Sequence, residues 1–356
     1  MKGSLSNITQ VIRSRYKPVF YDTTEPIRTW SEKDTIDDEV ADAFVIILRT
    51  RGCSWGLKTN CTMCGYFTDT TMGADVSEQD LTAQFKKAMK HYHNEKILKI
   101  FTSGSFLDEQ EIPGETRGYI LDHIPDEVKM LSIESRPEHI TDSSLDEMKK
   151  HQPDKDLEIG IGLETSDDKI RNDIINKGFT FNEYKRSACL VKKHGYRVKT
   201  YILVKPLFLT EREAIKDALK TVKDVEKYTT KISFNPVNVQ RYTLVEYHWR
   251  RREYTPPWLW SVTEILKESK RIIKNKGKIS LKCDPVGGGT RRGAHNCGAC
   301  DQMILKSIRE FTLTQDATVF NNLNCICKEQ WRDQLELEGI SFRSIIDTRI
   351  NRCEEE

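Results

Sequence analysis

The segment AFVIILRTRGCSWGLKTNCTMC, residues 43–64, decides the fold of this chain. It opens with a continuous apolar run from Ala43 to Leu48, which is typical of a strand buried on both faces. Three cysteines follow with the spacing Cys53-x7-Cys61-x2-Cys64. The segment therefore predicts a buried parallel strand that delivers three thiols to the loop at its carboxyl end.

The alternation of strand and helix continues beyond this segment. Helical patterns begin after Ser77 and Thr210, each of which can cap a first turn, and they separate short apolar runs. The further strands are expected at Ile97–Thr102, Lys129–Glu134, Leu157–Leu163, Tyr196–Val204 and Lys231–Phe234. Six strands alternating with helices predict an α/β fold, a partial (β/α)6 TIM-like barrel with its reactive groups at the carboxyl ends of the strands.

The chain divides into three parts by composition. Residues 1–42 are polar and mixed, and we expect an irregular N-terminal lead-in. Residues 43–250 carry the strand and helix pattern and form the expected core. Residues 251–356 hold six of the ten cysteines and are expected to form a C-terminal extension with a second metal site.

Composition limits the class of function. The 356 residues include 56 basic and 54 acidic side chains, and the net charge of +2 is too even to draw the whole protein onto nucleic acid. No run approaches the roughly 18 apolar residues of a membrane helix, and the start lacks the apolar core of a signal peptide. We therefore expect a cytoplasmic protein with no membrane partner. In a reducing compartment, ten cysteines indicate metal sites and not disulfides.

The first cysteine group suits an iron–sulfur cluster. Three thiolates can bind three irons of a [4Fe–4S] cube, and the missing fourth ligand leaves one iron open to another molecule. One alternative is a zinc site completed by a histidine, but the nearest, His91 and His93, fall at the end of a predicted helix. A second alternative, three buried thiols, conflicts with the polar loop around them.

A three-cysteine loop after the first strand of a six-unit βα chain resembles the radical S-adenosylmethionine (radical SAM) superfamily, whose Elongator-type branch also has an expanded first spacing. The resemblance implies that Cys53, Cys61 and Cys64 hold a [4Fe–4S] cluster with S-adenosylmethionine (SAM) on the open iron. It also implies cofactor contacts at later strand ends, namely Ser103 and Gly104 for the methionine amino group, Glu134 and Arg136 facing the cofactor, and Glu164 for the ribose.

Two features of the same region are less specific. The superfamily often has an aromatic residue before the third cysteine, near the adenine, whereas this chain has Met63 there. Lys199, Lys205 and Asn235 lie on or beside later strands and could face the barrel interior.

Within the superfamily, the chain resembles the radical SAM enzymes that form archaeosine in archaeal tRNA. This resemblance rests on the cysteine loop and on residues 102–108, 134–137 and 283–293. It implies a lyase that acts on tRNA at position 15 of the D-loop, after a partner subunit has attached lysine to the 7-cyano-7-deazaguanine base. The enzyme then breaks the lysine carbon–nitrogen bond, with a reductant such as a ferredoxin supplying the electron.

A second cysteine group lies near the C-terminus. Four of its members would satisfy a tetrahedral zinc ion, and Cys297-x2-Cys300 is a typical zinc knuckle. The alternatives are an auxiliary iron–sulfur cluster and unligated thiols. The possible ligands are Cys283, Cys297, Cys300, Cys325 and Cys327, with His295 close by. Cys189 is expected in the core, and Cys353 is not expected to have a role.

Contact with RNA is suggested by residues 247–260, which mix arginines with tyrosine and tryptophan rings, and by the arginines of residues 287–293. The alternative interpretation is a solvated basic helix whose tryptophans belong to the core. Two other functions remain open. An Elongator-like tRNA uridine modifier would need a further domain, yet few residues follow Cys327. A non-catalytic, metal-stabilised RNA-binding protein would leave the first cysteine group without a purpose.

Overall fold

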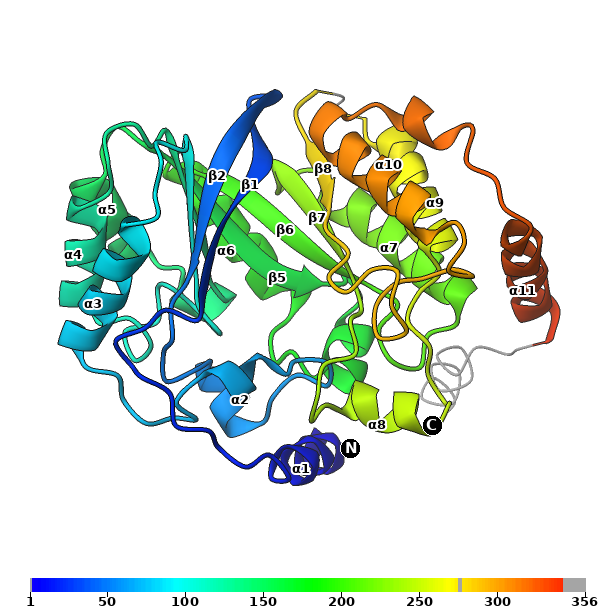
Figure 1. Cartoon of the computed structure of the whole chain (residues 1–356), viewed down its shortest axis with the longest axis horizontal. Coiled ribbons are helices and arrows are strands. Elements are labelled where there is room, and N and C mark those ends of the chain that lie inside the picture. Colours follow the sequence, from blue (N-terminus) through cyan, green and yellow to red (C-terminus); the bar gives the residue numbers. More distant parts are fainter. Residues whose placement is uncertain (1, 275–276, 342–356) are drawn as a thin grey trace.

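The computed structural model describes residues 2–274 and 277–341. Its centre is a curved eight-stranded sheet in which the strands follow one another in sequence order (Figure 1). β1 pairs antiparallel with β2, and each later strand is parallel to its neighbour. The strands are β1 (Arg28–Ile36), β2 (Glu39–Ile47), β3 (Ile97–Phe101), β4 (Met130–Glu134), β5 (Asp156–Glu164), β6 (Arg197–Val204), β7 (Lys231–Pro236) and β8 (Ser280–Cys283).

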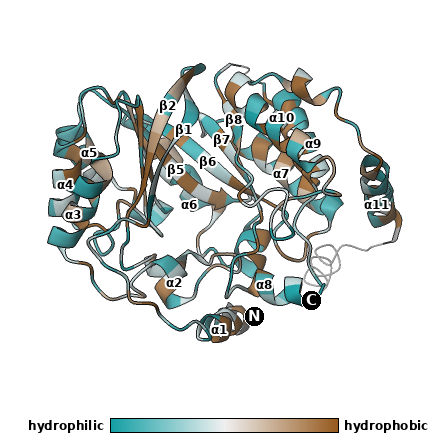
Figure 2. Ribbon diagram, viewed as in Figure 1, coloured by the Kyte–Doolittle hydropathy of each residue, from teal (hydrophilic) through white to brown (hydrophobic). Residues whose placement is uncertain are grey.

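Seven helices are placed outside the sheet, and a large apolar core fills the space between them and the strands. Figure 2 shows apolar residues along the strands, while the helices alternate between apolar and polar surface. The covering helices are α3 (Glu78–Met89), α4 (Gly114–Asp122), α5 (Asp142–His151), α6 (Phe181–Lys193), α7 (Glu211–Val225), α9 (Leu259–Ile272) and α10 (Asp301–Thr314).

Of the remaining helices, α11 contacts α7 of this layer, and the other three do not cover the sheet. α2 and α8 follow the carboxyl ends of β2 and β7, and α1 contacts α8, so all three lie on the side toward which the parallel strands point (Figure 1). The helices that do not cover the sheet directly are α1 (Lys2–Arg13), α2 (Ser54–Lys58), α8 (Leu244–Arg250) and α11 (Cys327–Ser341). Single helical turns lie at Tyr66–Asp69, Pro137–His139, Ile170–Ile174 and Ala317–Phe320.

Local sequence signals explain where the helices begin. The Ser77 side chain accepts a hydrogen bond from the Asp80 amide, and Thr210 forms a reciprocal capping box with Glu213, as predicted. Within α7, apolar side chains at three- and four-residue intervals face the core at Ala214, Ala218, Val222 and Val225. The predicted α/β half-barrel is therefore confirmed.

The prediction of an irregular N-terminus was wrong. Residues 2–13 form α1, and residues 28–36 form β1, which pairs along its whole length with β2. β8, from the expected C-terminal extension, adds an eighth strand beside β7. The six-strand pattern missed β1 because its inward-facing positions are charged instead of apolar, as Glu32 and Asp34 illustrate.

A layer of charged side chains fills the inner side of the half-barrel near the amino ends of its parallel strands. We call it the charged layer, and it comprises Glu32, Asp34, Lys99, Glu158, Lys199, Lys231 and Lys282.

Most members of the charged layer are closely paired. Lys99 contacts Asp34 and lies 2.6 Å from Glu32, while Lys282 lies 3.0 Å from Asp34. Lys231 lies 3.2 Å from Glu158. Because Asp34 comes from β1 and Lys282 from β8, these ion pairs connect the first strand of the sheet to the last, where no strand ladder joins them.

Among the described residues, no helix combines the length and apolar character that a membrane crossing requires.

Candidate active site and metal centre

The three cysteines of the first group lie in the loop between β2 and α3, at the carboxyl edge of the sheet. Cys53 is the residue before the short helix α2 and accepts from the Leu57 amide at 2.9 Å through its carbonyl, and the Cys64 amide donates to the Cys61 carbonyl at 3.2 Å. The side-chain amide of Asn60, itself in a left-handed conformation, donates to the Cys64 carbonyl at 3.0 Å. These bonds fix the backbone that presents the thiols.

The electrostatic surroundings show that the three thiols share one environment. Burial, together with a smaller effect of the neighbouring thiols of the group, raises the pKa of Cys61 to about 11 and that of Cys64 to about 12. The charges of Arg136 and Lys177 oppose this for Cys61. Without metal such thiols stay protonated at neutral pH, whereas bound iron favours the thiolate. Three thiols close to two cations, one buried and two partly buried, fit the donor set of a [4Fe–4S] cluster with an open iron.

The loop after β3 lies directly against this group. A Cβ at Gly104 would come within 2.6 Å of the Cys53 Cα, so only glycine allows this approach. Ser103 and Gly104 are half-buried. Behind them the Glu111 carboxylate accepts from the Thr50 hydroxyl and the Ser105 amide, both at 2.6 Å, and burial raises its pKa to about 7. The sequence analysis did not identify Glu111, because nothing in the residue pattern indicates that its carboxylate turns back toward Ser105.

Glu134 and Arg136 mark the end of β4. The Tyr201 hydroxyl on β6 donates to the Glu134 carboxylate at 2.5 Å, and burial raises the pKa of Glu134. The Arg136 guanidinium donates to Glu138 at 2.6 Å and to the Lys177 carbonyl at 3.0 Å. Glu134 thus faces the barrel interior.

Arg136 also lies close to the cysteine loop. Its guanidinium carbon is 5.3 Å from the ring centre of Trp55, which belongs to α2. Burial raises the pKa of Cys53, and the positive charge of Arg136 opposes part of this rise. The end of β4 and the cysteine loop therefore form one site.

Glu164 ends β5 in a left-handed conformation and accepts from the Lys177 ammonium at 2.6 Å. A Cβ at Gly162 would lie 2.7 Å from the same ammonium, so this glycine leaves room for Lys177. Lys177 was not among the predicted site residues, although its positive charge opposes the rise that burial causes in the pKa of Cys61. Its position in a turn, outside any strand, gave no signal.

The three later polar residues have separate surroundings. Lys199 belongs to the charged layer. Lys205 is buried and forms an ion pair with Glu211 at 2.6 Å, which commits it to the fold. Asn235 occupies the one half-buried position of β7.

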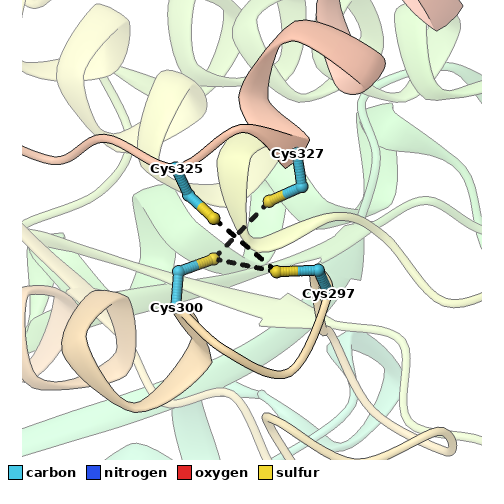
Figure 3. Close-up of side chains that lie close together, drawn as sticks. All are labelled: Cys297, Cys300, Cys325 and Cys327. Carbon is cyan, nitrogen blue, oxygen red and sulfur yellow. Dashed lines mark hydrogen bonds between the residues drawn. The ribbon is translucent and has the colours of Figure 1, made fainter.

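A second cluster of thiols lies between the start of α10 and the start of α11. Four sulfurs point toward one another (Figure 3), with separations of 3.9 Å between Cys297 and Cys300, 3.7 Å between Cys297 and Cys325, and 3.6 Å between Cys300 and Cys327. All four lie within 4.8 Å of one another. Gly298, with a φ of 91°, allows the tight turn between the first two.

The geometry of this cluster includes four of the five possible cysteine ligands and excludes the fifth. Cys283 lies in the apolar core at the end of β8 and is not part of the group. His295 directs its Nδ1 at the Gly293 carbonyl, at 2.8 Å. Neighbouring donors support the thiolates, because the Trp260 indole reaches the Cys327 sulfur at 3.2 Å and the Asn296 amide reaches Cys300 at 3.4 Å.

The sulfur separations match one metal ion. Four thiolates about 2.3 Å from a tetrahedral centre have sulfurs about 3.8 Å apart. The irons of a cluster lie apart from one another and would need a wider set of sulfurs. The geometry therefore suits a single metal ion.

The isolated cysteines need one correction. Cys189 is exposed on α6 and does not lie in the core as predicted, because it lies on the solvent side of that helix. Cys353 lies outside the described residues.

The two arginine-rich segments form one surface beside α8. The Trp249 indole donates to the Arg291 carbonyl at 3.2 Å, and the Arg292 guanidinium lies 4.8 Å from the Trp249 ring. Trp260 is buried in the core. Exposed cations surround this junction at Arg241, Arg250, Arg251, Arg252 and Arg291.

The fold and the three-cysteine site define the class of this protein: residues 47–222 match the Radical SAM superfamily. The chain is 40% identical to archaeosine synthase subunit beta of Methanosarcina acetivorans over 343 residues, which cover 95% of this chain and 98% of that protein. It belongs to the family of archaeosine synthase subunit beta.

Two further relatives complete the comparison. Archaeosine synthase subunit beta of Thermococcus kodakarensis is 38% identical over 309 residues, covering 85% of this chain and 94% of that protein. Among solved structures, Elp3 of Methanocaldococcus infernus aligns with 66% of this chain and 59% of its own, at 15% identity and a TM-score of 0.47.

Proposed function

We propose that this chain is a radical SAM lyase that completes archaeosine in tRNA. Its substrate is the lysine adduct of 7-cyano-7-deazaguanine at position 15 of the D-loop, and it breaks the carbon–nitrogen bond of the lysine side chain. The observation that carries this proposal is the three-cysteine loop at the carboxyl end of β2, in a chain of the archaeosine synthase subunit beta family.

Each part of the site has a role in this proposal. Cys53, Cys61 and Cys64 bind the [4Fe–4S] cluster, which with SAM supplies a radical able to remove a hydrogen atom from an unactivated carbon. Ser103 and Gly104 hold the methionine end of SAM, Glu134 and Arg136 face it, and Glu164 accepts from the ribose.

The protein's own residues supply position and exclusion of water. The hydrogen bond from Tyr201 holds the Glu134 side chain in place before any ligand binds. The Arg136 side chain is held in the same way by its hydrogen bonds to Glu138 and to the Lys177 carbonyl.

The arginine-rich surface beside α8 supports contact with tRNA. Its exposed cations can meet phosphates, and half-exposed rings such as Tyr247 and Trp249 can stack on bases. A lysine-transferring partner subunit and a ferredoxin-type reductant complete the system, which operates in the cytoplasm.

The four-thiol centre is proposed to hold a structural zinc ion. Cys300→Ala should reduce zinc from about one equivalent per chain to a small fraction of that, because three remaining thiolates leave the tetrahedron open. Elemental analysis of purified protein gives the zinc content. Cys283→Ala is the matched control, a buried cysteine outside the group, and should retain zinc. If Cys300→Ala keeps its zinc, or wild-type protein carries iron there, the assignment is incorrect.

The lyase activity is tested with anaerobically reconstituted protein, SAM, a strong reductant and tRNA carrying the lysine adduct. We expect 5′-deoxyadenosine by chromatography and archaeosine by mass spectrometry of the digested tRNA, in amounts that rise together. Transfer RNA with the unmodified 7-cyano-7-deazaguanine base serves as the control and should give no archaeosine. If reconstituted protein forms deoxyadenosine but never archaeosine from the adduct, the proposed substrate is wrong.

A further inference from the structure

The inner face of the half-barrel remains partly open above the charged layer. On each of β3 to β7, one position in the carboxyl-terminal half is half-buried, and the other residues are buried except Asp156 and Arg197 at the amino ends of β5 and β6. These positions are Phe101, Glu134, Gly162, Tyr201 and Asn235.

Gly160 on β5 leaves room on the inner face for two larger side chains from the neighbouring strands. A Cβ at Gly160 would lie 2.8 Å from the Tyr201 ring and 3.2 Å from the Glu134 side chain, so both larger side chains lie across β5. Tyr201 and Glu134, both half-buried, are therefore held on the inner face of the sheet, toward the carboxyl edge that carries the cysteine loop.

The charged layer below is not balanced. It contains four ammonium groups and three carboxylates, so its full ionisation leaves a charge of +1. Lys99, Lys231 and Lys282 each have a carboxylate oxygen within 3.2 Å. Lys199 is 3% exposed, yet its nearest carboxylate oxygen, on Glu158, is 3.7 Å away. Within the described residues its ammonium donates no side-chain hydrogen bond.

Lys199 also lies beside two of the half-buried residues of the inner face. Its ammonium is 5.0 Å from the ring centre of Tyr201 and 5.8 Å from that of Phe101. Glu134, the next carboxyl group, is already bonded to Tyr201, and burial raises its pKa, which weakens it as a counter-ion. Burial lowers the pKa of Lys199 to about 8, as expected for a cation short of negative partners.

We infer that Lys199 binds the free carboxylate at the amino-acid end of the substrate's lysine arm. This inference rests on the proposed function. Because the lysine is joined through its side-chain amine, its carboxylate lies at the far end of the arm and can enter the barrel ahead of the reacting carbon. There it supplies the negative charge that the layer lacks and gives Lys199 a hydrogen-bonded partner.

The test compares two tRNAs that differ only in the arm. One carries the lysine adduct, and the other carries the adduct of pentane-1,5-diamine, which has the same carbon–nitrogen bond and methylene chain but no carboxylate. Losing one partner of a buried charge pair weakens recognition by at least about 30-fold. We expect wild-type protein to prefer the lysine adduct by that factor in kcat/KM, measured as archaeosine formed.

Variants then locate the preference. Lys199→Met should remove the preference by lowering kcat/KM for the lysine adduct alone. Lys199→Arg, which keeps the positive charge, should retain part of the preference. Lys231→Met is the matched control, because it removes another buried lysine of the layer that already has carboxylate partners, and it should keep the preference. This separates direct contact from the overall charge of the layer.

The possible failures are distinguishable. Equal kcat/KM for the two adducts with wild-type protein overturns the inference and leaves the proposed function standing. An unchanged preference in Lys199→Met does the same. No archaeosine from the lysine adduct with active wild-type protein overturns the proposed function itself. If Lys199→Met does not fold, Lys199→Arg decides the matter, because its preference should fall below that of wild-type protein, and an unchanged preference overturns the inference.

Discussion

Replacing Cys64 with alanine will abolish cleavage of SAM while the fold survives. Two remaining thiols, Cys53 and Cys61, cannot hold three irons, so the loss should exceed the roughly 10–100-fold that removing an outer partner of a metal site costs. The fold should persist because Cys64 is only partly buried, in a loop that is fixed by backbone and Asn60 hydrogen bonds. Deoxyadenosine formation and iron content measure the loss, and thermal unfolding followed by circular dichroism measures the fold.

The matched control is Cys189→Ala, which removes an exposed thiol on α6, on the outer side of the sheet. It should leave iron content and deoxyadenosine formation unchanged. Wild-type rates from Cys64→Ala would remove Cys64 from the ligand set, and a comparable loss in Cys189→Ala would point to general damage.

Replacing Asp34 with asparagine should lower the free energy of unfolding by about 3–5 kcal/mol, because it leaves buried ammonium groups without their main partner. Asp34 is 2% exposed and contacts Lys99, Lys231 and Lys282. Chemical denaturation of both proteins under one condition gives the difference.

Asp42→Asn provides the comparison for this variant. Asp42 lies on the neighbouring strand β2 and pairs with Lys33 at 2.7 Å, but both side chains are more than half exposed. Such surface pairs contribute about 1 kcal/mol or less. Equal losses from the two variants would show that the charged layer does not stabilise the fold more than a surface ion pair does.

The Asp34 contribution should also depend on pH in a definite direction. Burial raises the pKa of Asp34, but Lys99, Lys282 and Lys231 together hold it well below its ordinary value. The folded protein therefore keeps Asp34 ionised where the unfolded chain would protonate it. The stabilisation is present above about pH 4, the unfolded value, and is lost as the pH falls toward the folded pKa.

The sequence predicted best where local patterns agree with the fold. Continuous apolar runs identified β2 to β7, and capping side chains such as Ser77 and Thr210 marked the starts of helices. The close Cys-x2-Cys and Cys-x-Cys spacings identified the four-thiol cluster, although spacing could not separate Cys283 from its true members.

The parts that sequence reasoning missed depend on contacts between distant residues. β1 looks polar because its inner side chains meet lysines from β3, β7 and β8. Glu111 and Lys177 reach the site from a loop and a turn, where no periodicity indicates direction. Cys189 was misplaced because apolar neighbours in sequence, such as Leu190, do not fix which side of a helix a residue occupies.

The ion pairs between β1 and β8 also bear on how the chain folds as it is made. Asp34 and Lys282 are separated by 248 residues. At a synthesis rate of about 5–20 residues per second, β1 waits about 12–50 s for its last partner to emerge. During that interval the β1–β2 hairpin can form and Lys99 of β3 can reach Glu32 and Asp34, but Lys282 is missing and the half-barrel cannot close. The ribosome therefore carries a folding intermediate whose exposed inner face needs protection until β8 arrives.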